Sequence, residues 1–157
     1  MGRSDAMPFR KALALLTIVM IVQFFGCERI ETVESSYATL AEALRAEAVG
    51  DTKWIPALLP ESARDIKEAH NLDTNEVWLA FELESSDLAF GAERCTRIAE
   101  ARLAGARKRP ARWWPDDLVR GTKQKNRVAS YQHYECSGKS FLSIDTANNK
   151  AYYWVLN

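Results

Sequence analysis

The segment Arg102–Arg127 combines basic and aromatic side chains in a pattern that suits an anionic ligand. Nine of its residues are Lys or Arg and two are Asp, a local charge of +7, whereas the rest of Glu28–Asn157 has nine basic and 18 acidic residues, a local charge of −9. Cationic side chains bind phosphates and lipid headgroups, and tryptophan supplies an apolar contact beside them. The candidate binding residues are Arg107, Lys108, Arg109, Arg112, Trp113 and Trp114.

Other interpretations of Arg102–Arg127 stay open at this stage. Charge runs mostly form solvated loops, and tryptophan is mostly buried, so the segment also fits a loop that pairs with the acidic remainder of the chain. Nucleic-acid binding by phosphate contact and base stacking needs the same residue types. Because the chain carries an export signal, described below, we expect any ligand to be an anionic lipid or an envelope protein and not nucleic acid.

Side chains suited to catalysis are sparse. Glu82 and Glu84 share one face of an expected strand about 7 Å apart, a spacing that two catalytic carboxylates could use, but alternating glutamates are usually the solvated side of a strand. The chain has two histidines, His70 and His133, and lacks a Gly-x-Ser-x-Gly or phosphate-binding motif. We therefore expect neither an enzyme nor a cofactor.

Two of the three cysteines, Cys95 and Cys136, predict a disulfide, provided that Cys27 is modified and the compartment is oxidising. Cys95 lies on the apolar stripe of an expected helix, so its side chain is expected to face the core. The alternative is a zinc site formed with His70 and His133. Structural zinc sites normally use two closely spaced ligand pairs, and only His133 and Cys136 are so spaced, hence we expect no metal.

The residues before Cys27 are typical of an export signal. Arg10 and Lys11 precede an apolar run, Ala12–Gly26, that is too short for a permanent membrane span. The sequence Phe24-Phe25-Gly26-Cys27 resembles the lipobox of bacterial lipoproteins. The resemblance implies cleavage before Cys27 and attachment of lipid to that cysteine; the alternative is an ordinary signal or a short anchor.

The export signal determines the domain organisation that we expect. We expect a signal peptide over 1–26, a lipidated cysteine and flexible tether over 27–36, and one domain over 37–157. The residue after Cys27 is Glu28 and not the Asp that favours inner-membrane retention in enterobacterial lipoproteins. The resemblance therefore implies a lipid anchor that faces the periplasm, in the outer membrane more readily than the inner.

Hydrophobic periodicity predicts an α+β fold. The expected helices are Tyr37–Val49, Glu61–Ala69 and Asp87–Ala104. The expected strands are Glu76–Glu84, Val128–Cys136, Phe141–Asp145 and Ala151–Leu156. Short turns separate the last three strands, which predicts a C-terminal three-stranded meander within an antiparallel sheet of about four strands, with the helices packed on one face.

The segment Trp54–Trp78, with its prolines at Pro56 and Pro60, resembles a stretch in small uncharacterised proteobacterial lipoproteins. The resemblance implies a shared envelope domain and no activity. We expect a membrane-anchored, non-enzymatic envelope lipoprotein that binds another envelope component. The alternatives are a periplasmic inhibitor or immunity protein that blocks a hydrolase or toxin, and a small hydrolase that uses Glu82 and Glu84.

Overall fold

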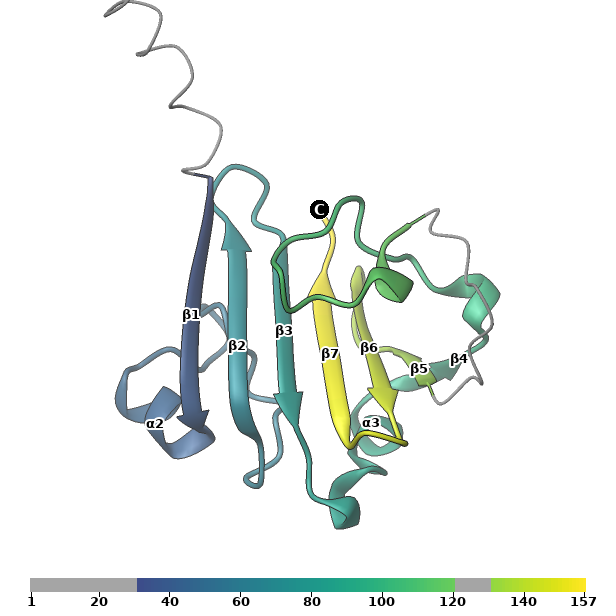
Figure 1. Ribbon diagram of the computed structural model, residues 1–157, viewed down its shortest axis with the longest axis horizontal. Coiled ribbons are helices and arrows are strands. Elements are labelled where there is room, and N and C mark those ends of the chain that lie inside the picture. Colours follow the sequence, from purple (N-terminus) through teal and green to yellow (C-terminus); the bar gives the residue numbers. More distant parts are fainter. Residues whose placement is uncertain (1–30, 121–130) are drawn as a thin grey trace, which may run out of the picture. The chain divides into compact units, whose positions relative to one another are not determined.

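Seven antiparallel strands form one sheet in the computed structural model, which describes residues 31–120 and 131–157 (Figure 1). Residues 32–157 make a compact unit of their own. The strands are β1 (Thr32–Thr39), β2 (Arg64–Asn71), β3 (Val77–Glu82), β4 (Thr96–Ile98), β5 (Tyr131–Glu135), β6 (Ser140–Asp145) and β7 (Lys150–Val155). Their order across the sheet is β1-β2-β3-β7-β6-β5-β4. The predicted meander is present as β5-β6-β7.

Helices are few and short among the described residues. The α-helices are α2 (Leu40–Arg45) and α3 (Phe90–Arg94), and the 3-10 turns are η1 (Ser85–Asp87), η2 (Glu100–Arg102) and η3 (Asp116–Leu118). The fold is therefore predominantly β, and the predicted α+β fold with a four-stranded sheet and helices on one face is wrong. None of the described helices is long and apolar enough to cross a membrane.

The expected helix Tyr37–Val49 is shorter and starts later than predicted. Residues 32–36, expected to belong to a flexible tether, pair with β2 as part of β1, and the strand continues to Thr39. The Thr39 side chain then accepts a hydrogen bond from the Glu42 backbone N–H at 3.2 Å, and the Glu42 carboxylate accepts one from the Ala38 N–H at 2.8 Å. The two hydrogen bonds run in opposite directions between the end of the strand and the first turn of the helix. They place the N-terminal cap at Thr39, so α2 begins only after β1 ends.

The expected helix Glu61–Ala69 is a strand because both faces of the sheet are covered. Ala63, Ile66 and Ala69 are fully buried, at the three-residue spacing typical of a helix. In β2, however, Ile66 and Ala69 lie on opposite faces and pack in different hydrophobic cores. A strand with two buried faces therefore produces a pattern that resembles a helical stripe.

The expected helix Asp87–Ala104 is broken near Cys95, whose backbone is extended at the end of α3. Phe90 before the break packs in one core and Ile98 after it packs in the other. The segment therefore passes around the edge of the sheet instead of lying on one face. Gly91 permits a close approach here, because a Cβ at that position would lie 2.9 Å from the Tyr134 ring.

The sheet separates two hydrophobic cores. In β3, Leu79 and Phe81 face the first core, which α2 and α3 also join, and Trp78 faces the second. This alternation is the one that the sequence predicts for Glu76–Glu84. The second core lies between the sheet and the segment 103–118, drawn in green, which crosses one face of the sheet in front of β3 and β7 (Figure 1). The basic segment is thus attached to the sheet through this second core.

Candidate functional site

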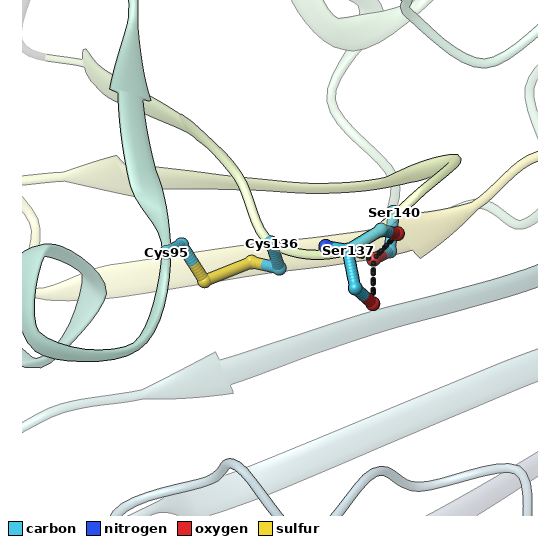
Figure 2. The surroundings of a disulfide bond; sticks show 4 residues. All are labelled: Cys95, Cys136, Ser137 and Ser140. Carbon is cyan, nitrogen blue, oxygen red and sulfur yellow. Dashed lines mark hydrogen bonds between the residues drawn. A yellow bond between two sulfur atoms is a disulfide. The ribbon is translucent and has the colours of Figure 1, made fainter.

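Cys95 and Cys136 form a disulfide bond, as the sequence predicts (Figure 2). The bond joins the start of β4 to the end of β5, across a sequence separation of 41 residues, and encloses the basic segment in one covalent loop. The two sulfur atoms are used in this bond, so they do not serve as thiolate ligands of a zinc ion. Residues 121–127 of the basic segment lie outside the described part of the chain.

The turn after Cys136 has a fixed geometry. Ser140 donates from its hydroxyl group to the Ser137 backbone oxygen at 2.6 Å, and its Oγ accepts from the Ser137 backbone N–H at 3.0 Å (Figure 2). Gly138 has a φ angle of +57°, which favours glycine. The turn therefore holds Lys139, which is exposed, in a defined place before β6.

The two tryptophans of the basic segment have different environments. Trp114 is fully buried in the second core, where it packs edge-on against Trp154 with ring centroids 5.6 Å apart. Trp113 is half-buried and donates from Nε1 to the Glu34 carboxylate of β1 at 3.1 Å. Trp114 is thus a structural residue with no surface for a ligand, whereas Trp113 retains a partly exposed ring.

Arg109 stabilises the loop that carries it. Its guanidinium group donates to the backbone oxygen of Trp114 at 3.2 Å and to that of Arg112 at 2.7 Å, and it lies 3.6 Å from the Asp116 carboxylate. The other predicted cations in this loop, Lys108 and Arg112, are exposed. Arg109 therefore stabilises the loop, and the exposed cations Lys108 and Arg112 lie on either side of it in the sequence.

Three cations from separate segments line one pocket, which we call the basic pocket. Arg107 and Arg120 come from the two ends of the loop over the second core, and Lys139 comes from the β5–β6 turn. Phe141 and Leu156 add apolar side chains, and the pocket has a volume of about 300 Å³. Its described lining includes no Asp or Glu side chain, but it does include Asn157, whose main-chain oxygen accepts a hydrogen bond from Arg107. A site of this composition suits an anionic group that is attached to an apolar part.

Backbone pairing sets the positions of the pocket residues. The N–H of Ala106 donates to the Leu118 oxygen at 2.9 Å, and that of Arg120 donates to the Ala106 oxygen at 2.7 Å, so Arg107 and Arg120 lie on adjacent chain segments. Gly105 makes this approach possible, because a Cβ there would lie 2.9 Å from the Leu118 oxygen. On the other side of the pocket, Leu156 donates from its N–H to the Lys139 oxygen at 3.1 Å.

Of the residues in the basic pocket, sequence analysis selected only Arg107. Arg120 belongs to the predicted basic segment but was not among its candidate residues, and Lys139 lies outside that segment. The tight Ser-Gly-Lys turn indicates that Lys139 is exposed. Nothing local in the sequence indicates that it lies beside Arg107.

The carboxylates Glu82 and Glu84 are not arranged as a catalytic pair. Glu82 lies 3.3 Å from Lys150, and Glu84 lies 2.6 Å from Arg64. A small pocket of about 50 Å³ beside Trp113 is lined by Glu82 and not by Glu84. Each carboxylate thus has its own cation, and the two do not converge on one cavity.

Both histidines are buried and paired, which the sequence analysis did not foresee. Nδ1 of His70 lies 2.7 Å from the Glu68 carboxylate, and the ring of His70 stacks on Trp54 at a centroid distance of 4.0 Å. Burial raises the pKa of Glu68, although the hydrogen bond and charge of His70 act against this shift. The spacing of two residues on one strand is the only local indication of this pair.

His133 lies on the second-core face of β5. Its Nδ1 is 2.7 Å from the Ser143 hydroxyl group, and Ser143 is fully buried. Burial lowers the pKa of His133, and the Glu100 carboxylate partly offsets this effect. A serine without exposed surface cannot meet a substrate, so the pair stabilises the packing of β5 on β6.

Residues 31–82 match the model of the family described as the YbbD head domain. The match covers β1, α2, β2 and β3, about a third of the chain, and it includes the segment Trp54–Trp78. It contains neither Cys27 nor any residue of the basic pocket. No curated protein and no solved structure matches the chain. The likeness therefore concerns the N-terminal three strands of the sheet.

Proposed function

We propose that the chain is a non-enzymatic lipoprotein of the cell envelope, anchored at Cys27, whose domain binds an anionic ligand in the basic pocket. The observation that carries the proposal is the convergence of Arg107, Arg120 and Lys139 on one cavity whose described lining has no Asp or Glu side chain. Three cations that line one pocket repel one another, and an anion bound among them offsets this repulsion.

Two properties of the pocket favour a phosphate-bearing ligand. Arginine forms paired hydrogen bonds to phosphate oxygens through its planar guanidinium group, and two of the three cations are arginines. Phe141 and Leu156 provide an apolar surface beside the cations. The pocket therefore accepts a headgroup-like molecule more readily than a bare inorganic anion.

The proposed lipid anchor at Cys27 is inferred from the sequence. The residues Phe24–Cys27 resemble a lipobox, and the disulfide is consistent with an oxidising compartment such as the periplasm. The outer membrane remains the favoured location because Glu28 follows the cysteine.

Ligand binding can be measured on the full chain in detergent. The probes are inorganic phosphate and glycerol 3-phosphate, and the readout is the rise in the unfolding temperature Tm, because a ligand that binds only the folded state stabilises it. The test variant is R107Q/R120Q/K139Q. The control variant, R45Q/R64Q/K150Q, removes the same charge from residues outside the pocket.

We expect glycerol 3-phosphate to raise the Tm of the wild type and of the control variant, and to leave the Tm of R107Q/R120Q/K139Q unchanged. An equal rise in all three proteins would show that any binding lies elsewhere. No rise in the wild type would overturn the proposed binding of a phosphate-bearing ligand.

A further inference from the structure

The end of the sheet at which β1 begins also carries the ends of its partner strands. Thr32 pairs with Asn71 at the end of β2, and Val77 at the start of β3 pairs with Val155 at the end of β7. Val155 also pairs with Ser140 at the start of β6. We call this the leading end of the sheet, because the chain enters β1 there (Figure 1).

The basic pocket lies at this leading end. Asn157, two residues after β7, donates from Nδ2 to the Thr74 oxygen in the β2–β3 turn at 2.8 Å. The backbone oxygen of the same residue accepts from Nη2 of Arg107 at 3.0 Å. A chain of hydrogen bonds thus runs from the β2–β3 turn to the pocket, and Lys139 immediately precedes β6 at the same end.

Little chain separates the expected lipid anchor from the leading end. Cys27 precedes Thr32 by five residues, which span at most about 18 Å when fully extended. The expected tether of nine residues would have reached much farther, but its second half belongs to β1. A lipid on Cys27 therefore keeps the start of β1 within about two Debye lengths of the membrane surface at physiological salt.

We propose that the leading end docks on the bilayer that holds the anchor, and that the basic pocket receives the phosphate of an anionic phospholipid headgroup. This inference rests on the proposed function, because it needs both the lipid on Cys27 and the anionic specificity of the pocket.

The distribution of charge at this end determines how the domain tilts. Asp73 is exposed in the turn between β2 and β3, and an anionic surface repels it. Arg107, Arg120 and Lys139 lie on the side of β7 and β6. The domain therefore leans toward its basic pocket. Each basic residue near an anionic surface favours the bound state. Loss of all three positive charges is therefore expected to weaken docking on the order of 100-fold.

The experiment uses the full, lipidated chain in vesicles of phosphatidylcholine alone or mixed with anionic phosphatidylglycerol. Hydrogen–deuterium exchange of the backbone is followed by mass spectrometry. Slower exchange is expected in the anionic vesicles at residues 137–140, which lie at the leading end beside the basic pocket. The β6–β7 turn, residues 146–149, lies at the opposite end of the sheet and serves as an internal control.

The variants give the specificity of this protection. R107Q/R120Q/K139Q is expected to lose the protection at 137–140, whereas R45Q/R64Q/K150Q is expected to keep it. Protection that is the same in both kinds of vesicle, or that is strongest at 146–149, would overturn the docking proposal.

The measurement with soluble glycerol 3-phosphate distinguishes the docking proposal from the proposed function. If glycerol 3-phosphate raises the Tm through the basic pocket and anionic vesicles give no protection at the leading end, the pocket binds a soluble phosphate compound and docking is wrong. If neither probe acts through the pocket, both proposals fall. If labelled palmitate is not incorporated, the anchor, and the docking with it, is excluded while the pocket measurement still stands.

Discussion

Nη2 of Arg107 lies 3.0 Å from the main-chain oxygen of Asn157. The basic loop is therefore hydrogen-bonded to the chain two residues beyond the interior strand β7. The two residues are 50 positions apart in sequence. This contact gives the loop a second attachment besides the burial of Trp114 in the second core. Arg107 is therefore held at the end of the sheet where β7 ends, whereas Trp113, farther along the loop, lies beside Glu82 and Lys150.

Replacing Cys27 with Ala is expected to release the protein from membranes, because the lipid and not a protein helix would provide the attachment. Incorporation of labelled palmitate and the distribution between soluble and membrane fractions measure this. Replacing the exposed Ser36 of β1 with Ala serves as the control variant. Undiminished labelling of the Cys27→Ala protein would refute the lipobox assignment.

Replacing both Cys95 and Cys136 with Ser is expected to lower the free energy of unfolding by about 4 kcal/mol. The reason is that the bond closes a loop of about 40 residues and restricts the unfolded chain. Denaturant unfolding of the wild type with and without reductant, and of the double variant, measures the difference. Mass spectrometry of the unreduced wild type is expected to find the two cysteine peptides joined, and free thiols at both positions would contradict the bond.

Trp114→Ala and its neighbour Trp113→Ala form a matched pair. The first is expected to cost about 3–5 kcal/mol of unfolding free energy, because it leaves a cavity beside Trp154 in the second core. The second removes a half-buried ring and one hydrogen bond to Glu34, and is expected to cost about 1 kcal/mol. Equal losses in the two variants, measured by urea unfolding, would contradict the assignment of Trp114 to the core.

His133 is expected to make the protein less stable in acid. Burial lowers its pKa in the folded state below the ordinary value of 6.5, so the unfolded state binds the proton more readily. The stabilisation is present above pH 6.5 and is lost as the pH falls through the folded-state pKa. Compared with His133→Gln, the wild type should lose unfolding free energy between pH 7.5 and pH 5; parallel curves for the two proteins would show that His133 titrates normally.

The sequence predicts correctly those strands whose side chains alternate with a two-residue period or that flank a short turn with typical turn residues. Glu76–Glu84 alternates between two sets of side chains, and the Ser-Gly-Lys turn separates β5 from β6, so both features were predicted correctly. Val77–Phe81 and Arg64–Asn71 both have buried residues on both faces, but the buried Ala63, Ile66 and Ala69 recur every three residues, and this spacing imitates a helix. The spacing of apolar residues within a short stretch does not show that a distant segment of the chain covers the second face of the sheet.

The composition of the basic pocket was foreseen only in part, for a related reason. The excess of Lys and Arg around Arg107 is a local property of the sequence, whereas the proximity of Lys139 follows from the pairing of β6 with β7 and from the hydrogen bond of Leu156 to the Lys139 oxygen. Trp114 was expected as a possible ligand contact because composition does not reveal which of two adjacent tryptophans points into the core. Long-range pairing decides both matters.

The place of β7 in the sheet has a consequence for how the protein folds. β7 follows the other six strands in the chain, yet it lies between β3 and β6, in the interior of the sheet. Until it arrives, β3 and β6 each present an unpaired edge with apolar side chains, which is the arrangement that promotes aggregation. During synthesis the sheet therefore cannot close before Lys150–Val155 is available, and premature termination within this strand should yield insoluble protein instead of a smaller stable domain.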